Sequence, residues 1–126
     1  MYTLLFSILF KIIYMEKITK ENFLRDKENK IKNLVSSGDD FFVKTFNFLY
    51  VYYLLKNLFT QSPILSVFIA IYIKKLKFPA WKLANYCNLS RSSLFNYRNE
   101  IVRNFESCLN ERLIEKESIF TEGLKL

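Results

Sequence analysis

Apolar residues recur at helical spacing near the start of the chain. Residues 16–37 carry them at Ile18, Phe23, Leu24, Ile31, Leu34 and Val35, with charged residues between them. This periodicity predicts a charged amphipathic helix. The small and polar stretch at residues 36–40 then breaks the pattern, with Gly38 at a helix C-terminal position and Asp39 or Asp40 suited to cap the next helix.

Two strongly apolar segments follow this break. Residues 41–59 and 64–73 are apolar on nearly all sides, although Lys44 and Lys56 interrupt the first segment. Both are predicted to be buried core helices rather than a membrane hairpin, because a span needs roughly 20 consecutive apolar residues. Ser62 suits an N-cap and Pro63 the first helical position. The many aromatic side chains of the first segment are interpreted as core packing and, as an alternative, as a dimer surface.

The first fourteen residues are apolar but too short to cross a bilayer. They are interpreted as a leader or upstream extension ahead of Met15, with a packed helix or a weak membrane anchor as the alternatives. We therefore divide the chain into residues 1–14, a charged helix and linker over 15–40, and a helical domain over 41–126. A membrane role is not favoured, and a cytoplasmic location is expected.

Residues 80–99 match the requirements of a helix-turn-helix in register. Ala84 is the small residue at which the second helix crosses closely, and Asn88 tolerates the left-handed backbone of the turn. Leu89 is the apolar residue of the turn, and Ser90 suits the N-cap of the second helix. That helix, over about residues 91–104, is anchored to the core by Leu94, Tyr97 and Ile101 at spacings of three and four, with Phe105 on the same side.

The opposite side of the second helix is polar and contains no acid. At about 100° per residue, Ser92, Asn96, Asn99 and Arg103 share one face. Asn and Arg can read base edges, and Ser can bind phosphate or base. Arg98 points nearer the core and is expected to contact a neighbouring helix instead. The candidate DNA-binding residues are Lys74, Lys75, Lys77, Lys82, Ser90, Arg91, Ser92, Ser93, Asn96, Asn99 and Arg103.

The net charge of +7 comes from basic residues in and around this motif. Eight basic residues and only Glu100 as an acid lie between Lys56 and Arg103, whereas the remaining eleven basic and eleven acidic residues cancel. Such an excess favours a polyanionic partner. The lysines at 74, 75, 77 and 82 are interpreted as contacts to the phosphate backbone.

The sequence has few residues in patterns typical of catalysis or metal binding. The chain has no histidine, only two isolated glycines, and two cysteines twenty-one residues apart, Cys87 and Cys108. These absences disfavour histidine-based catalysis, a glycine-rich phosphate loop and a zinc site. No enzymatic activity, metal or cofactor is therefore predicted, and both cysteines are interpreted as buried thiols.

The C-terminal residues 111–126 change period, which predicts one or two short strands that could form a β-wing. We expect a mainly α fold, which is a helical bundle that contains a helix-turn-helix with or without a β-wing. At 51% apolar residues, the chain is rich enough to form a core.

Residues 58–105 resemble the helix-turn-helix domain of Mga-type virulence regulators of Gram-positive bacteria, and the resemblance covers about residues 41–126, the predicted DNA-binding domain. The matching positions are Ser62, Leu83, Ala84, Leu89, Ser90–Leu94 and Ile101. The resemblance implies a bacterial transcription regulator that binds double-stranded DNA with the second helix in the major groove. A homodimer through the aromatic side chains of the first apolar segment is left open. The phosphorylated regulatory domains and dimerising domain of full-length members have no counterpart here. The alternative is a non-enzymatic helical protein that binds a protein or a membrane, in which the three helices are structural.

Overall fold

The chain is helical through almost its whole length. The computed structural model describes the backbone of residues 2–124 and, within it, the side chains of residues 7–9, 11–12, 15 and 18–111. The helices are α1 (Tyr2–Ser36), α2 (Asp40–Thr60), α3 (Ile64–Phe68), η1 (Ile69–Ile73), α4 (Ala80–Tyr86) and α5 (Arg91–Leu124). The prediction of a mainly α protein is confirmed.

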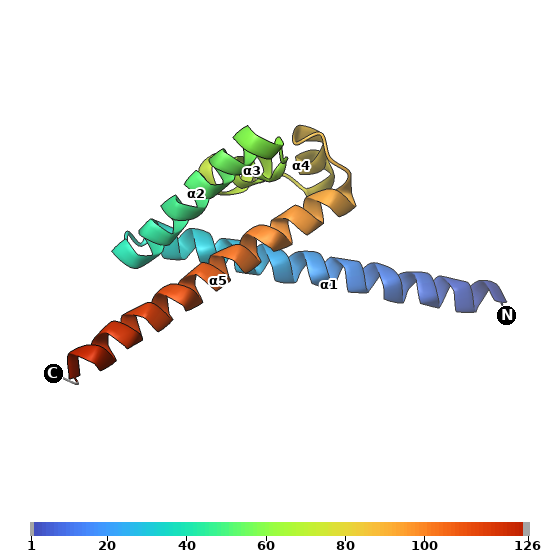
Figure 1. The fold of residues 1–126 in the computed structure, drawn as a ribbon. Helices are drawn as coiled ribbons and strands as arrows, with labels where there is room; N and C mark the ends of the chain where they lie inside the picture. Colours follow the sequence, from blue (N-terminus) through green and yellow to red (C-terminus); the bar gives the residue numbers. More distant parts are fainter. Residues whose placement is uncertain (1, 125–126) are drawn as a thin grey trace.

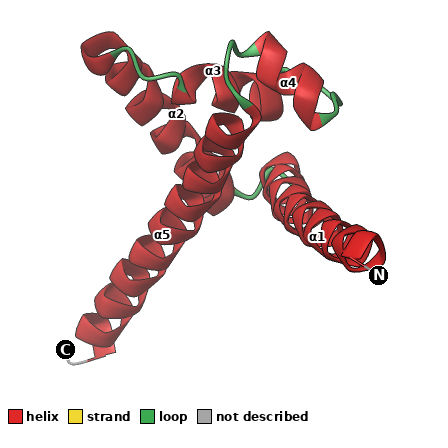
Figure 2. Cartoon of the chain, turned by 90° about the vertical axis from the view of Figure 1, so that its right-hand side faces the viewer, coloured by secondary structure: helices red, strands yellow, loops and turns green. Residues whose placement is uncertain are grey.

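Two long helices cross at the centre of the molecule. Figure 1 shows α1 and α5 crossing, with the N-terminal part of α1 and the C-terminal part of α5 projecting away from the other helices in different directions. The shorter helices α3 and α4 lie near the N-terminal end of α5, and α2 packs against α1, α3 and α5 (Figure 2). The core therefore lies around the crossing, and the two projecting ends lie outside it.

The predicted break after α1 is confirmed. Gly38 has a φ of +78°, and its amide donates to the carbonyl of Val35 at 3.2 Å, which ends the helix. Asp39 then caps α2, because its Oδ1 accepts from the amide of Phe41 at 3.0 Å. Before this break, α1 runs without interruption through Met15, and no Pro or Gly occurs within it. Leu24 and Ile31 of α1 belong to the same buried core as the later helices, across the predicted boundary at residue 40.

An aromatic cluster around Phe68 forms part of the core. The ring of Phe68 lies 5.1 Å from Phe46, 5.2 Å from Tyr53, 5.4 Å from Tyr72 and 5.7 Å from Tyr50, centroid to centroid. Such ring pairs stabilise a core beyond the area they bury. Some of the aromatic side chains of residues 41–53 thus pack in the core, as predicted.

The prediction that residues 41–59 form a buried core helix holds for one side of the helix alone. Helix α2 buries only Thr45, Leu49 and Tyr53, on the side facing the other helices. Its other side is exposed and mostly apolar, since the main contacts of α2 are with α1, α3 and α5. The exposed large side chains are Phe48, Val51, Tyr52, Leu54, Leu55, Leu58 and Phe59.

The predicted C-terminal wing is also wrong. Residues 111–124 continue α5 as one helix, and the described part of the chain contains no strand. The physical reason is local: after Arg91 the chain has no proline, and its only glycine is Gly123, so nothing in between interrupts the backbone hydrogen bonds. The second helix of the motif is therefore far longer than the predicted 91–104.

The segment between α2 and α4 contains an unusual turn of helix. Helix α3 passes directly into the π-helical η1, so that Lys74 donates its amide to the carbonyl of Ile69 at 2.8 Å. Lys75 then adopts a φ of +52°, and the amide of Leu76 closes the turn on the carbonyl of Ala70 at 3.0 Å. The following segment leads to Pro79, which precedes the first turn of α4. This geometry places several lysines beside α1 and α4.

Candidate nucleic-acid interface

Helices α4 and α5 are joined by a tight turn at residues 87–90. Asn88 has a φ of +55°, the left-handed conformation predicted for it. The amide of Leu89 donates to the carbonyl of Ala84 at 2.9 Å, and Leu89 is half-buried. Both observations agree with the sequence-based assignment of the turn.

Ser90 caps α5 as predicted. Its Oγ accepts from the amide of Ser93 at 3.1 Å, which satisfies one of the unpaired donors of the first turn. The same hydroxyl donates to Oγ of Ser93 at 2.9 Å and lies 3.3 Å from Oγ of Ser92. The three serine hydroxyls therefore form one cluster at the start of α5, beside the exposed side chain of Arg91.

The packing between α4 and α5 follows the predicted anchors. Leu83 and Ala84 are buried on α4, and Leu94, Ile101 and Phe105 are buried on α5. Small Ala84 sits where α4 packs against α5. Because these side chains are in the core, the opposite face of α5 is turned toward solvent.

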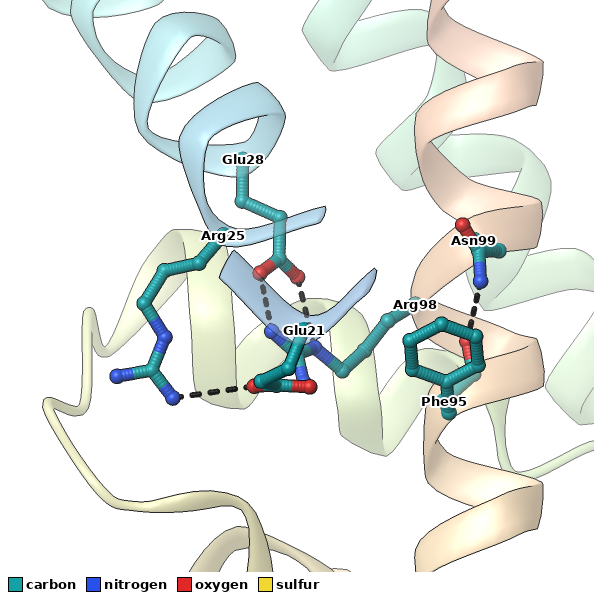
Figure 3. Close-up of polar contacts among 6 residues, drawn as sticks. All are labelled: Glu21, Arg25, Glu28, Phe95, Arg98 and Asn99. Atoms are coloured by element: carbon teal, nitrogen blue, oxygen red, sulfur yellow. Dashed lines mark hydrogen bonds and ion pairs between the residues drawn. The ribbon is translucent and has the colours of Figure 1, made fainter. Parts of the chain in front are cut away.

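The residues of the predicted polar face of α5 differ in their exposure. Ser92, Asn96 and Arg103 are exposed, but Asn99 is half-buried and its Nδ2 donates to the carbonyl of Phe95 at 3.2 Å (Figure 3). Arg103 lies twelve residues beyond Arg91, about 18 Å along the helix axis at 1.5 Å per residue. Asn96 and the serine cluster thus form one exposed group at the first turns of α5, and Arg103 lies well beyond it.

The four predicted phosphate-binding lysines separate into two pairs. Lys74 and Lys82 are on the α4 side: Nζ of Lys74 donates to the hydroxyl of Tyr86 of α4 at 2.6 Å, and Lys82 belongs to α4, with its Nζ 4.4 Å from the ring centroid of Phe78. Lys75 and Lys77 instead line a groove shared with α1. The predicted set is therefore not a single surface.

Arg98 makes the strongest polar contacts between α1 and α5. Its Nε and Nη2 donate to the two carboxylate oxygens of Glu28 at 3.1 and 2.6 Å, and its Nη1 donates to both oxygens of Glu21 at 2.7 and 2.8 Å (Figure 3). Arg98 and Glu28 are both buried. Burial lowers the pKa of the Arg98 guanidinium, but hydrogen bonding and charge attraction from Glu28 and Glu21 outweigh burial and raise it. The net effect is a pKa above the ordinary arginine value. The expectation that Arg98 contacts a neighbouring helix is confirmed.

These ion pairs change the charge count made along the sequence. Arg98 is neutralised by acids of α1, and Nζ of Lys56 lies 3.6 Å from Oε1 of Glu100. Within the described residues, no salt bridge is seen for six basic residues of the stretch 56–103, which are Lys74, Lys75, Lys77, Lys82, Arg91 and Arg103. The basic character around α4 and α5 persists, but it is smaller than the linear count implied.

Comparison of the chain with protein-family models, with curated proteins and with solved structures found no significant match. The resemblance to Mga-type regulators thus stays a prediction from the motif residues. Over the described side chains, no group of His, Cys, Asp and Glu is arranged to hold a metal ion. Neither Cys87 nor Cys108 forms a disulfide, and burial raises the pKa of the Cys87 thiol. Among the helices that the structure describes, none has the length and apolar character needed to cross a membrane.

Sequence reasoning missed the acidic partners of Arg98. A signal was present, since Glu28 occupies the same helical stripe as Leu24, Ile31 and Val35, at spacings of four, three and four. A buried acid in an apolar stripe requires a basic partner. The groove beside Lys75 and Lys77 left no such signal, because it depends on how α1 is placed against the turn after η1.

Proposed function

We propose that the chain binds double-stranded DNA through α4 and α5, as a transcription regulator without catalysis. The single observation that carries the proposal is the exposed, acid-free group at the first turns of α5, formed by Arg91, Ser92 and Asn96 beyond a tight turn. Helix-turn-helix proteins read bases with the N-terminal residues of their second helix in the major groove. The short α4 and the Ser90 cap hold this end of α5 in place.

Two kinds of contact are assigned to these residues. Asn96 is the proposed base-reading residue, because an amide can pair with an adenine edge through two hydrogen bonds. The proposed backbone contacts are Arg91, the hydroxyls of Ser90, Ser92 and Ser93, Lys82 of α4, and Lys74, which contacts α4. Arg103 and Asn99 are assigned to a flanking role, since they lie further along α5 and Asn99 is bonded to its own helix.

Binding of the purified chain to a labelled duplex tests the proposal. We expect the logarithm of the binding constant to fall linearly with the logarithm of the salt concentration, because Lys and Arg release counterions from the phosphates. Arg91→Ala should weaken binding to all sequences, whereas Lys44→Ala, which removes a cation on α2 paired with Asp40, should leave binding unchanged. A chain that binds no duplex at low salt contradicts the proposal.

A second candidate function, protein interaction, is favoured by the exposed face of α2. Phe48 and Leu55 lie seven residues apart, as do Val51 and Leu58, which is the spacing of a helix that packs along another helix. This stripe carries no charge at positions 48, 51, 55 and 58, and the exposed Lys44 lies in register with it at its N-terminal end. A second copy of the same chain is the proposed partner, because two identical seams of this spacing complement each other. The homodimer also suits a DNA-binding protein, whose half-sites mirror the twofold symmetry of the protein.

A further inference from the structure

A groove with a volume of about 420 Å³ lies between α1 and the segment that joins η1 to α4. One wall is a stripe of α1 whose members recur at helical spacing: Arg25, Asn29, Lys32, Asn33 and Ser36. This wall carries cations, amides and a hydroxyl, all of which donate hydrogen bonds. The volume is that of a pocket for one small molecule.

The facing wall adds more positive charge. Lys75 and Lys77 line the groove from the turn after η1, and Arg98 and Glu28 also line it. Because Arg98 and Glu28 are paired with each other, they add no net charge. The remaining charged groups are Arg25, Lys32, Lys75 and Lys77, of which only Arg25 forms a salt bridge, with Nη2 3.2 Å from Oε1 of Glu21. The lining of the groove therefore carries more positive than negative charge, since its one acid, Glu28, is paired with Arg98.

Burial and neighbouring charges both act on Lys32. Partial burial lowers the pKa of Lys32, Glu28 raises it, and the positive charges of Arg25, Arg98 and Lys75 lower it, with a net decrease. An anion placed between Lys32 and Lys75 would offset the repulsion between these two cations. The excess of positive charge along the lining therefore suits the groove to a negative ligand.

Part of the lining of the groove is apolar. Ile71, Leu76, Phe78 and Leu83 form this apolar part, which we call the floor. A bare inorganic ion would use only the polar walls. A ligand with an anionic end and a flat or apolar body would use both the walls and the floor.

We infer that this groove binds a small phosphorylated ligand of about the size of a mononucleotide, with its phosphate between Lys32 and Lys75 and its apolar part on the floor near Phe78 and Leu83. The inference does not depend on the DNA-binding proposal, whose proposed contacts at Arg91 and Asn96 do not line the groove. The phosphate could also come from a DNA backbone, so the experiment separates the two sources.

The test uses the full chain, with AMP and inorganic phosphate as probes and isothermal titration calorimetry as the measurement. We expect AMP to bind at least about tenfold more tightly than inorganic phosphate, because only AMP can cover the apolar floor. Lys32→Gln and Lys75→Gln should each weaken AMP binding about tenfold or more, since each removes a hydrogen bond to a charged group. Lys30→Gln is the matched control, because Lys30 is exposed on α1 and does not line the groove, and it should bind AMP as the unaltered chain does.

Circular dichroism of each variant shows whether it is folded, and Lys75→Gln keeps a non-glycine residue at the left-handed position, so its backbone strain is unchanged. The inference is overturned if AMP does not bind at about 10 mM, or if it binds equally to Lys30→Gln, Lys32→Gln and Lys75→Gln. It is also overturned if the two groove variants lose affinity for a DNA duplex while AMP never binds, since the phosphate would then belong to the duplex. Failure of DNA binding with intact, lysine-dependent AMP binding overturns the proposed function alone.

Discussion

Arg98 and Glu28 lie seventy residues apart in the sequence and form a buried bidentate ion pair, with Nε 3.1 Å from Oε2 and Nη2 2.6 Å from Oε1. The pair joins α5 to α1 directly behind the predicted DNA-binding segment. Glu21 completes the contacts of the guanidinium (Figure 3). The position of α1 thus depends on a polar network as well as on Leu24 and Ile31 in the core.

We expect Arg98→Ala to destabilise the fold by about 3–5 kcal/mol, because Glu28 would remain buried without a partner for its charge. Urea unfolding followed by circular dichroism measures this loss. Lys56→Ala is the control, since Lys56 and Glu100 form a more exposed pair and should contribute less than about 1 kcal/mol. Equal losses in the two variants would contradict the importance assigned to the buried network.

A substitution at Tyr72 is expected to stabilise the fold. Its hydroxyl is buried, and no hydrogen-bond partner for it is seen among the described residues. Tyr72→Phe keeps the ring contact with Phe68 but removes the unsatisfied hydroxyl. We expect the free energy of unfolding to rise by about 1 kcal/mol, measured as a higher thermal midpoint. A clear drop in the midpoint would show that the hydroxyl makes a stabilising contact.

Tyr53 makes the fold sensitive to alkaline pH. Burial raises the pKa of its phenol from 10.0 to about 12, although its hydrogen bond from Asn104 acts in the other direction. Below pH 10 the phenol is protonated in both the folded and the unfolded chain, so its contribution is constant. Between pH 10 and about 12 only the unfolded chain loses the proton, and stability falls by up to about 1.4 kcal/mol per pH unit.

Urea midpoints between pH 9 and pH 12 test this sign. Tyr53→Phe should flatten the decline, whereas Tyr52→Phe, on the exposed side of α2, should retain it. Burial also raises the pKa of Tyr72, so part of the decline remains in Tyr53→Phe. An unchanged slope in that variant would mean that Tyr53 does not cause the effect.

The exposed face of α2 predicts self-association. Leu55→Lys places a charge in the middle of this face and should convert a dimer to a monomer in sedimentation equilibrium. Asn57→Lys adds the same charge to the same helix outside the heptad seam and should leave the mass unchanged. If the unaltered chain sediments as a monomer at all concentrations, this face does not pair two copies.

Local features of the fold could be predicted from the sequence because their causes are local. The break at Gly38, the cap at Asp39 and the left-handed Asn88 each depend on the backbone preferences of one residue. The prediction of a C-terminal wing was wrong for a related reason. Its apolar residues suggested a strand, but the tail has no proline and only a late glycine to stop a helix that had already begun.

Features that depend on two distant segments could not be predicted in the same way. The apolar composition of α2 suggested a buried core helix, whereas the helices that pack against it decide how much of it is covered. The lysines at 74, 75, 77 and 82 formed one group in the sequence, but Lys82 belongs to α4 and Lys74 contacts α4, whereas Lys75 and Lys77 line the groove beside α1. The anchors of α5 needed no such information, because their helical spacing alone gives the buried face.

The most direct test of the central claim is selection of binding sites from a pool of random duplexes, followed by anisotropy titration of the enriched duplex. We predict that one sequence is enriched and that Asn96→Ala lowers affinity for it by about 1–3 kcal/mol while affinity for an unrelated duplex is unchanged. Asn110→Ala, on an exposed part of α5 away from α4, should have no effect. If no sequence is enriched, or if Asn96→Ala and the unaltered chain bind the enriched duplex equally, α5 does not read DNA as proposed.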